Sequence, residues 1–430
     1  MKTLIIILVL ALPVAAATRT WNGSVSPSWS NAANWDEGAT PVNGDDLIFP
    51  HGANSTSVND LPDGLLVHSI TININGIRIS GNAIMLDAGG IDAHSPFLLH
   101  QTGGLVDFTN VTLNASQSWS GSAQPEIVII SHLNLNGMRL TIGGGAYGIR
   151  SLSGAGSIVN LAGSFSAGST SNAPIKIAGG FFGLTGTAGN VQVNNGRFRL
   201  LAGAPREVTV TGGGTLDVSN LSGIGPSHSG SIAFVPAVGA PTHVVVGYTA
   251  FDSIIQQISG TIALGYAQLA INGSVPNLGG SALVIFNNDG DDSVEGTFMG
   301  LPEGSIINSG GTSNRISYRG GDGNDVTLTL LEAGVPSSVT TVTSLTNPSV
   351  PNQPVTLLAT VNSRLGDIEF YDGTFRLSVA PVDIFGQASL TVPFSVGTHT
   401  ITAAYTGATS LAISQATVEQ RVIARRHAAR

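Results

Sequence analysis

The sequence predicts an all-β protein: a right-handed parallel β-helix, or solenoid, followed by an immunoglobulin-like β-sandwich. Three observations predict this class. Glycine is abundant, with 56 of 430 residues, and only 10% of residues are charged, which excludes a coiled coil. The hydrophobic content of 42% argues against wholesale disorder. Short segments of alternating apolar and polar residues are separated by glycine and asparagine, as expected for strands joined by turns.

The first residues have the layout of a secretory signal. Lys2 precedes an apolar run at 4–12, and small residues follow at 15–17. We expect cleavage before Thr18, so that residues 1–17 are a signal peptide and the mature chain is secreted or held at the cell surface. The run is too short to cross a bilayer, and polar residues interrupt every later apolar stretch. We therefore expect no transmembrane segment in the mature chain.

Charge and cysteine content limit the partners. The formal net charge is −9, and Lys2 and Lys176 are the only lysines, so no basic surface could follow a phosphate backbone. We expect no nucleic acid partner, and we interpret the basic end at 425–430 as a solvated tail. The chain contains no Cys, which excludes disulfides and thiolate metal sites. Stability must come from packing and backbone pairing.

One short pattern recurs in the larger, N-terminal part of the chain. Two alternating apolar segments flank a turn in which glycine can supply the positive φ that a tight turn requires, at Gly76, Gly137, Gly196 and Gly213. Each unit alone would be marginal, but neighbouring copies could stack and bury a shared apolar stripe, as in a solenoid. A meander of hairpins is the alternative, although the long Gly-rich segments between copies favour the solenoid. The copies are ININGIRI at 72–79, LNLNGMRL at 133–140, VQVNNGRFRL at 191–200 and VTVTGGGTLDV at 208–218.

Five alternating strands follow near the C-terminus, at a spacing of roughly ten residues that suits a small β-sandwich. We assign the solenoid to 18–331, a linker to 332–338 and the sandwich to 339–424, and we expect few contacts to cross the linker. Period-2 alternation places Phe370 inward and Glu369 outward on an exposed strand face. We also expect the inward sets around Phe370 and Tyr405 to meet across the two sheets.

Two phrases in this C-terminal segment carry a family resemblance. DIEFYDG at 367–373, followed by GTHTITAAY at 397–405, closely resembles the bacterial Ig-like domain (group 3). The usual Gly-Asp after the tyrosine-containing strand is Gly407-Ala408 here. The resemblance implies a spacer or adhesive module rather than a catalytic one.

The segments at the two ends of the predicted solenoid carry a second resemblance, to bacterial secreted proteins with autotransporter-associated β-strand repeats. It implies a passenger-like β-helix without a known activity. Autotransporters also carry a large membrane β-barrel, and we do not expect this chain to anchor itself in that way. The matching phrases are WNGS at 21–24, SWSNAANW at 28–35, Pro41 and GDDLIF at 44–49 in the opening, and Asp289-Gly290, GTF at 296–298, LPEG at 301–304, ISY at 316–318 and GGDGNDVTL at 320–328 in the closing segment.

Motifs for catalysis or cofactor binding are sparse. Gly143-x-Gly145-x-x-Gly148 matches a dinucleotide fingerprint, but no helical periodicity follows it. The nine His residues lack ligand spacing for zinc. A polysaccharide-active enzyme on a β-helix would need at least two positioned carboxyl groups, yet no Asp or Glu occurs between Glu126 and Glu207. The carboxyl residues that flank this gap stand singly: Asp92, Asp107, Asp217 and Asp252.

Two further clusters are open to a binding interpretation. The acidic turns at 289–292 and 322–325 have an oxygen spacing that Ca²⁺ favours, but each is a single copy, and we interpret them as solvated turns whose side chains bond their own backbone. Trp21, Trp29 and Trp35 could stack on sugar rings, but a solenoid also needs its open end covered, which favours a capping role.

The sequence therefore predicts a non-enzymatic, exported structural or adhesive protein at the bacterial cell exterior. Its solenoid would serve as a stalk or a binding surface, with a surface glycan or a protein as partner. We assign no catalytic, cofactor-binding or metal-binding residue. The alternative is a polysaccharide-active β-helix enzyme or a carbohydrate-binding protein, which three carboxylates in one groove would favour.

Overall fold

The computed structural model confirms an all-β fold, with one short 3-10 helix, η1 (Ala32–Asn34), among the described residues. The chain divides into two compact units, Met1–Ser157 and Ile158–Arg430, which we describe separately. The structure describes residues 17–73, 76–94, 105–121, 127–169, 173–200, 204–218, 227–236, 238–247, 256–273, 282–289, 292–331, 334–408 and 411–424. The predicted signal at 1–17 lies outside this set except for Ala17, and the predicted tail at 425–430 lies wholly outside it.

The first unit consists of short strands that stack in parallel. The buried positions Ile84, Val111, Leu133 and Leu152 are register partners in turn, so four aliphatic side chains form one ladder through successive coils. Burying each such side chain contributes about 1.5–3 kcal/mol. The strands are β1 (Thr18–Thr20), β2 (Asp45–Phe49), β3 (Thr56–Asn59), β4 (Leu65–Ile72), β5 (Arg78–Gly81), β6 (Ile84–Ala93), β7 (Leu105–Phe108), β8 (Val111–Leu113), β9 (Gln117–Gly121), β10 (Ile127–Asn134), β11 (Arg139–Ile142) and β12 (Ala146–Ser153).

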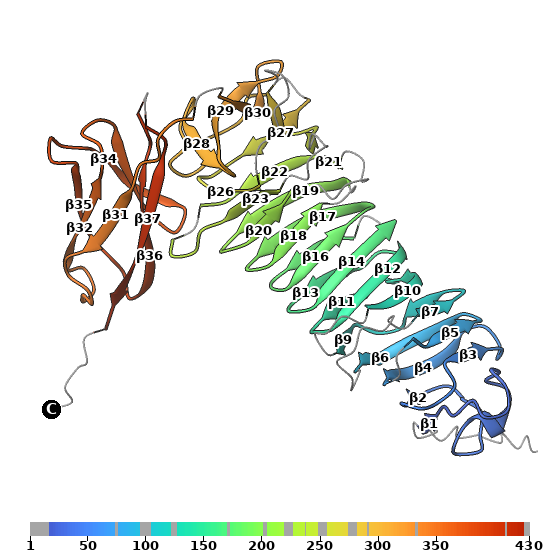
Figure 1. Ribbon diagram of the computed structural model, residues 1–430. Coiled ribbons are helices and arrows are strands. Elements are labelled where there is room, and N and C mark those ends of the chain that lie inside the picture. Colours follow the sequence, from blue (N-terminus) through green and yellow to red (C-terminus); the bar gives the residue numbers. More distant parts are fainter. Residues whose placement is uncertain are drawn as a thin grey trace, which may run out of the picture. The chain divides into compact units, whose positions relative to one another are not determined.

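The second unit begins with the same kind of coil (Figure 1). Phe165, Phe182 and Phe198 are register partners on β14, β16 and β18, and their rings stack with centroids 5.1 and 5.8 Å apart. These coils contain β13 (Ser157–Asn160), β14 (Ser164–Ser169), β15 (Ile175–Ile177), β16 (Phe181–Leu184), β17 (Thr187–Asn194), β18 (Arg197–Leu200), β19 (Ala204–Thr211), β20 (Thr215–Asp217), β21 (Ser227–Ser229), β22 (Ser231–Phe234), β23 (His243–Gly247), β24 (Gln256–Ile258), β25 (Ile262–Ala263) and β26 (Gln268–Asn272).

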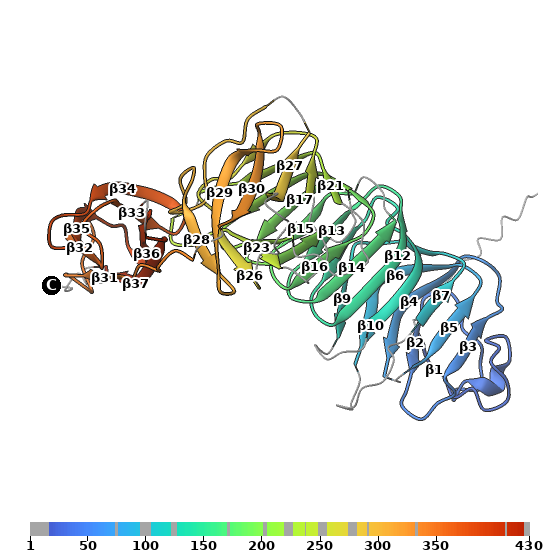
Figure 2. The same ribbon diagram turned by 45° about the horizontal axis from the view of Figure 1, so that its top comes forward.

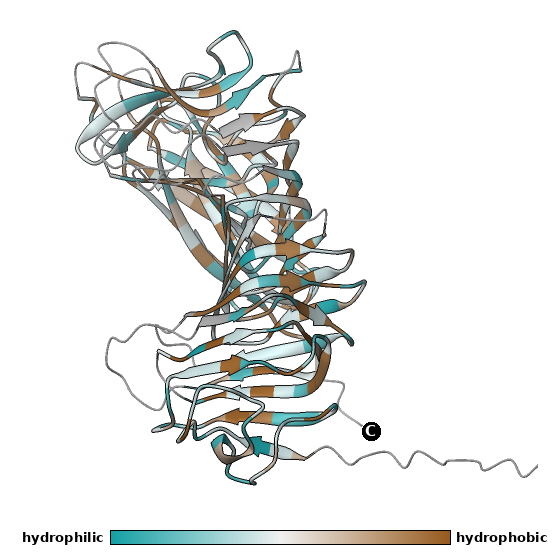
Figure 3. Cartoon of the chain, turned by 90° about the vertical axis from the view of Figure 1, so that its right-hand side faces the viewer, coloured by the Kyte–Doolittle hydropathy of each residue, from teal (hydrophilic) through white to brown (hydrophobic). Residues whose placement is uncertain are grey.

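A second ladder runs beside the phenylalanine stack and accounts for the apolar stripe that the repeats predict. Its members are aliphatic, register-paired and buried: Ile158, Ile175, Val191, Val208, Ile232 and Ile262. Figure 3 shows the same arrangement as hydrophobic bands that recur at matching positions of successive strands within each unit.

The strands on either side of each repeated turn pair with neighbouring coils rather than with each other. β17 pairs with β15 and β19, and β18 pairs with β16 and β20, all in parallel. This parallel pairing confirms the solenoid and shows that the hairpin meander is wrong. Positive φ at Gly76, Gly137 and Gly213 agrees with the predicted turns. In the remaining copy, Asn195 takes the positive φ of 58° in place of Gly196.

The parallel coils give way to an antiparallel sheet at 283–330. β27 pairs in parallel with β24 on one side and antiparallel with β30 on the other, and β29 pairs antiparallel with both β30 and β28. The last part of the segment that we assigned to the solenoid therefore differs from the coils in its pairing (Figure 2). Its strands are β27 (Leu283–Asn288), β28 (Ile306–Ser309), β29 (Thr312–Gly320) and β30 (Asp325–Leu330).

The C-terminal strands form the predicted sandwich, with sheets in the orders β31-β32-β35 and β34-β33-β36-β37. Ile368 pairs with Tyr405, and Phe370 with Ala403, within one sheet, so the expectation that these sets meet across the two sheets is wrong. All four are buried in the module core. The strands are β31 (Thr340–Ser344), β32 (Pro354–Val361), β33 (Asp367–Asp372), β34 (Phe375–Pro381), β35 (Gln387–Pro393), β36 (Gly397–Tyr405) and β37 (Ser414–Val422).

Candidate functional site

Strand β33 of the sandwich is buried on both faces. Its inward residues Ile368 and Phe370 lie in the module core, while Tyr371 is 0% and Glu369 8% exposed. The expectation that Glu369 lies on an exposed face is therefore wrong, because the end of the coils covers that face. The residues of this contact, which we call the junction, are Gly239, Tyr266, Met299 and Gly300 on the coil side and Glu369, Tyr371, Asp372, Arg376 and Ala404 on the module side.

The phenol of Tyr371 lies at the centre of the junction. Its oxygen accepts a hydrogen bond from the Gly300 N–H at 3.2 Å, and its O–H donates to Glu369 Oε2. Burial, followed by the charge of Glu369, raises the pKa of Tyr371 above its usual value. The phenol therefore remains a hydrogen-bond donor at physiological pH.

Gly300 fits this contact because it has no side chain. Its φ is +66°, and a Cβ there would lie 2.6 Å from the Ala404 Cβ. Only glycine allows the coil end to approach the module this closely without a shift. Arg376 contacts both sides of the junction. Its guanidinium lies 4.9 Å from the centre of the Tyr266 ring, and its Nη1 donates to Glu369 Oε1 at 3.1 Å.

Asp372 forms a second polar contact of the junction. Its Oδ1 accepts from the Gly239 N–H at 3.0 Å, and its Oδ2 lies 2.6 Å from His399 Nδ1. The other ring nitrogen of His399 lies 3.0 Å from the Ser395 carbonyl oxygen. Both ring nitrogens thus lie within hydrogen-bond distance of an oxygen atom. Asp372 and His399 are both buried.

The described part of the linker, 334–338, is hydrogen-bonded to both of its neighbours. The Val335 N–H donates to Ser313 Oγ at 2.8 Å, and Asn308 Nδ2 donates to the Val335 carbonyl at 2.8 Å. On the module side, the Ala412 N–H donates to the Pro336 carbonyl at 2.9 Å. The expectation that few contacts cross the linker is therefore wrong.

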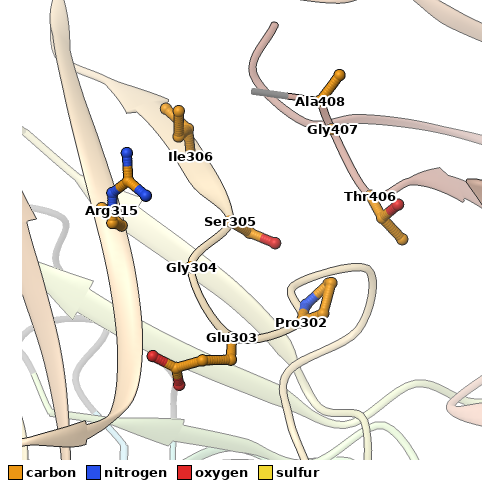
Figure 4. A pocket seen from close by; sticks show the side chains of 9 residues that line it. All are labelled: Pro302, Glu303, Gly304, Ser305, Ile306, Arg315, Thr406, Gly407 and Ala408. Carbon is orange, nitrogen blue, oxygen red and sulfur yellow. The ribbon is translucent and has the colours of Figure 1, made fainter. Parts of the chain in front are cut away.

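A polar pocket of about 390 Å³ is lined by residues 302–306, by Arg315 and by residues 406–408 (Figure 4). Arg315 and Glu303 are exposed at one side, and Ser305 Oγ is buried without a hydrogen-bond partner among the described residues. Glu303 supplies the one carboxyl group of the lining, whereas glycoside hydrolysis usually uses two. The pocket could bind a polar group. Its lining residues are Pro302, Glu303, Gly304, Ser305, Ile306, Arg315, Thr406, Gly407 and Ala408.

The three tryptophans at the start of the chain are buried in the first unit. The rings of Trp21 and Trp29 contact Trp35 with centroids 5.1 and 5.7 Å apart, and all three pack on Phe49. Each indole N–H has an internal acceptor, in Asn54, Ser57 and Trp29 respectively. The indole faces are therefore core surface and are closed to a stacked sugar.

The two acidic turns meet in the antiparallel sheet. Asp289 and Asp322 are exposed, as expected for solvated turns, but Asp325 is only 5% exposed and accepts from the Asn288 N–H at 2.9 Å. The interpretation of both turns as solvated is wrong for Asp325. Residues 290–291 lie outside the described residues.

The other sequence candidates lie in different segments of the chain. Gly143 and Gly145 lead into strand β12 rather than a helix, so this segment has no helix N-terminus to hold a pyrophosphate. Asp217 is buried and binds Arg197 and Arg199, with Oδ2 distances of 2.7 and 2.6 Å. Asp252 lies outside the described residues. Within the described ranges, no group of three or more His, Cys, Asp or Glu residues could hold a metal ion.

These features define a two-part β protein, a parallel solenoid joined to an immunoglobulin-like sandwich. Residues 341–423 match the family model of the bacterial Ig-like domain (group 3). No curated protein and no solved structure shows significant similarity to the chain. Among the described residues, no helix is long and apolar enough to cross a membrane.

Sequence reasoning missed the junction, although one signal was present. Tyr371 occupies an outward position of β33, where a large aromatic side chain indicates that a neighbouring element covers the face. Asn288 was also missed, because its hydrogen bonds join two turns that are far apart in the sequence.

Proposed function

We propose that the chain is a non-enzymatic, exported structural protein of the bacterial cell exterior, whose Ig-like module is docked on the end of a passenger-like solenoid. The observation that carries this proposal is the buried contact between Tyr371 and Gly300, with Met299 and Ala404 beside it. A flexibly tethered module would not need such a contact. Docking makes module and coil end one rigid part, which suits a load-bearing or spacing role.

The interior of the coils supports the same proposal. Ladders such as Ile158, Ile175 and Val191 fill it with close-packed apolar side chains. Along the coils, Asp92, Asp107 and Asp217 each take part in an ion pair. We propose an adhesive role in addition, with a glycan or a protein on another surface as partner.

Export is tested through the predicted signal. Leu8→Arg places a charge in the apolar run and should block export, whereas Leu8→Ile should leave it intact. The full chain is expressed in a bacterial host, the fractions are compared by immunoblot, and the exported product is sequenced from its N-terminus. We expect a product that begins at Thr18. Retention of the unaltered chain in the cytoplasm would overturn the exported role.

The structural role is tested with the exported chain. It is screened against arrays of glycans and matrix proteins, and in parallel it is incubated with polysaccharides while new reducing ends are measured. The structural role expects no cleavage of any polysaccharide, and the adhesive role expects in addition that at least one glycan or matrix protein is bound. Release of reducing ends that Glu303→Gln abolishes would identify the pocket as an active site and overturn the proposal.

A further inference from the structure

Hydrogen bonds connect the end of β27 with the β29–β30 turn and with Asp292. Asn288, the last residue of β27, donates from its backbone N–H to Asp325 Oδ1 at 2.9 Å and from Nδ2 to the Asp292 carbonyl at 2.5 Å. Asn324 Nδ2 donates to the same carbonyl at 3.1 Å. The two acidic turns are therefore joined through Asn288, which lies between Asp292 and Asp325.

Two side-chain oxygens of this group have no donor. Asn288 is 0% exposed, and neither its Oδ1 nor Asp292 Oδ2 has a hydrogen-bond partner among the described residues. Buried polar atoms are nearly always paired, because an unpaired one loses its hydration without compensation. An unpaired carboxylate oxygen is the more costly of the two, since it carries charge.

The local charge is uncompensated as well. Of the five aspartates in the two turns, the structure describes four, and none of the ion pairs of the described residues includes any of these four. Like charges on neighbouring turns repel one another, and a positive charge between the turns would offset that repulsion. The four described aspartates are Asp289, Asp292, Asp322 and Asp325.

We propose that this group of polar side chains binds one Ca²⁺ ion through Asn288 Oδ1, Asp292 Oδ2 and the carboxylate of Asp325. The donor set consists of carboxylate and amide oxygens, which hard cations prefer. Ca²⁺ accepts such sets in flexible geometries of six to eight oxygens, completed by backbone carbonyls and water, whereas Mg²⁺ demands a near-ideal octahedron. No thiolate is available, since the chain lacks Cys. The ion would tie the end of β27 to the β29–β30 turn.

The test begins with the full chain, stripped of metal with EGTA. Calcium chloride is titrated into it in a calorimeter, and melting is followed with and without the salt. A site with a dissociation constant near 0.1 mM should raise the melting temperature by about 2 °C or more at roughly 10 mM Ca²⁺. Magnesium chloride at equal concentration and sodium chloride at equal ionic strength should produce a clearly smaller rise.

The matched variants are Asp292→Asn and Asp322→Asn, which remove the same charge from a half-buried proposed ligand whose Oδ2 is buried and from an exposed neighbour. Asp292→Asn should weaken Ca²⁺ binding by at least about tenfold. It should also melt at or above the parent chain in EGTA, because it loses an unpaired buried charge. Asp322→Asn should retain the Ca²⁺-dependent rise.

The proposal is overturned if the parent chain shows neither heat of binding nor a Ca²⁺-dependent rise. It is also overturned if Mg²⁺ stabilises the chain as much as Ca²⁺ does, or if the two variants respond alike. Should Asp292→Asn fail to fold, Asp325→Asn takes its place, because its amide oxygen can still accept from the Asn288 N–H. The calorimetric titration of the parent chain tests Ca²⁺ binding without relying on either variant.

Discussion

Gly300 and Tyr371 form a hydrogen bond across the junction, with the Gly300 N–H donating to the phenol oxygen at 3.2 Å inside a contact closed to solvent. The bond joins a turn that follows the coils to a strand of the Ig-like module. Because the same tyrosine donates to Glu369, the three groups form a chain of hydrogen bonds. Removing any member leaves a buried partner unsatisfied, which costs more than the bond itself contributes.

The first prediction concerns access to the linker. The backbone of 334–338 is hydrogen-bonded on both sides, so limited proteolysis of the full chain should be slow there. Gly300→Ala should speed cleavage, because its Cβ would lie 2.6 Å from the Ala404 Cβ and force the module away. Gly304→Ala is the control, since Gly304 also has positive φ but no atom within 4 Å of the added Cβ. Equal cleavage rates in the two variants would show that the junction does not protect the linker.

The second prediction concerns Glu369. Glu369→Ala removes the acceptor of the Tyr371 O–H and the partner of Arg376, and should lower the free energy of unfolding by about 1–3 kcal/mol. Glu419→Ala on β37 is the matched control: it is exposed, and it should cost no more than about 0.5 kcal/mol. Chemical denaturation measures both. Equal effects would mean that β33 is solvated on its outer face.

The third prediction concerns the other face of the same strand. Phe370→Ala should leave a cavity in the module core and cost about 3–5 kcal/mol. Tryptophan fluorescence should change little, because every Trp lies in the first unit, while circular dichroism should report the loss of the module. A loss of less than about 1 kcal/mol would contradict the assignment of Phe370 to the core.

Much of the fold follows from the local sequence pattern. The expectations that proved wrong depend on contacts between residues that are far apart in the sequence. Alternation in DIEFYDG correctly indicates which side chains of β33 enter the module core, because strand geometry alone decides that. It could not show that the coil end covers Glu369, since the covering residues lie far away in the sequence. Asn-Gly turns likewise indicate where a strand bends but not whether its partner is the adjacent segment or the next coil. In the turn at 195–196, Asn195 rather than Gly196 has the positive φ, because asparagine also tolerates that conformation.

The last prediction concerns the aromatic stack of the second unit. Phe182 lies between Phe165 and Phe198, with centroids 5.1 and 5.8 Å away, and all three side chains are buried. Phe182→Ala should therefore cost about 3–5 kcal/mol, because coils stacked in register can collapse little around a cavity. Phe181→Ala is the matched control: this ring is only half-buried and contacts Arg199, so its loss should cost roughly 1 kcal/mol. Thermal and urea unfolding followed by circular dichroism compare the two. If Phe181→Ala proves the more damaging, the side-chain register of β16 must be shifted by one residue, which would reverse the inward and outward faces of the coil.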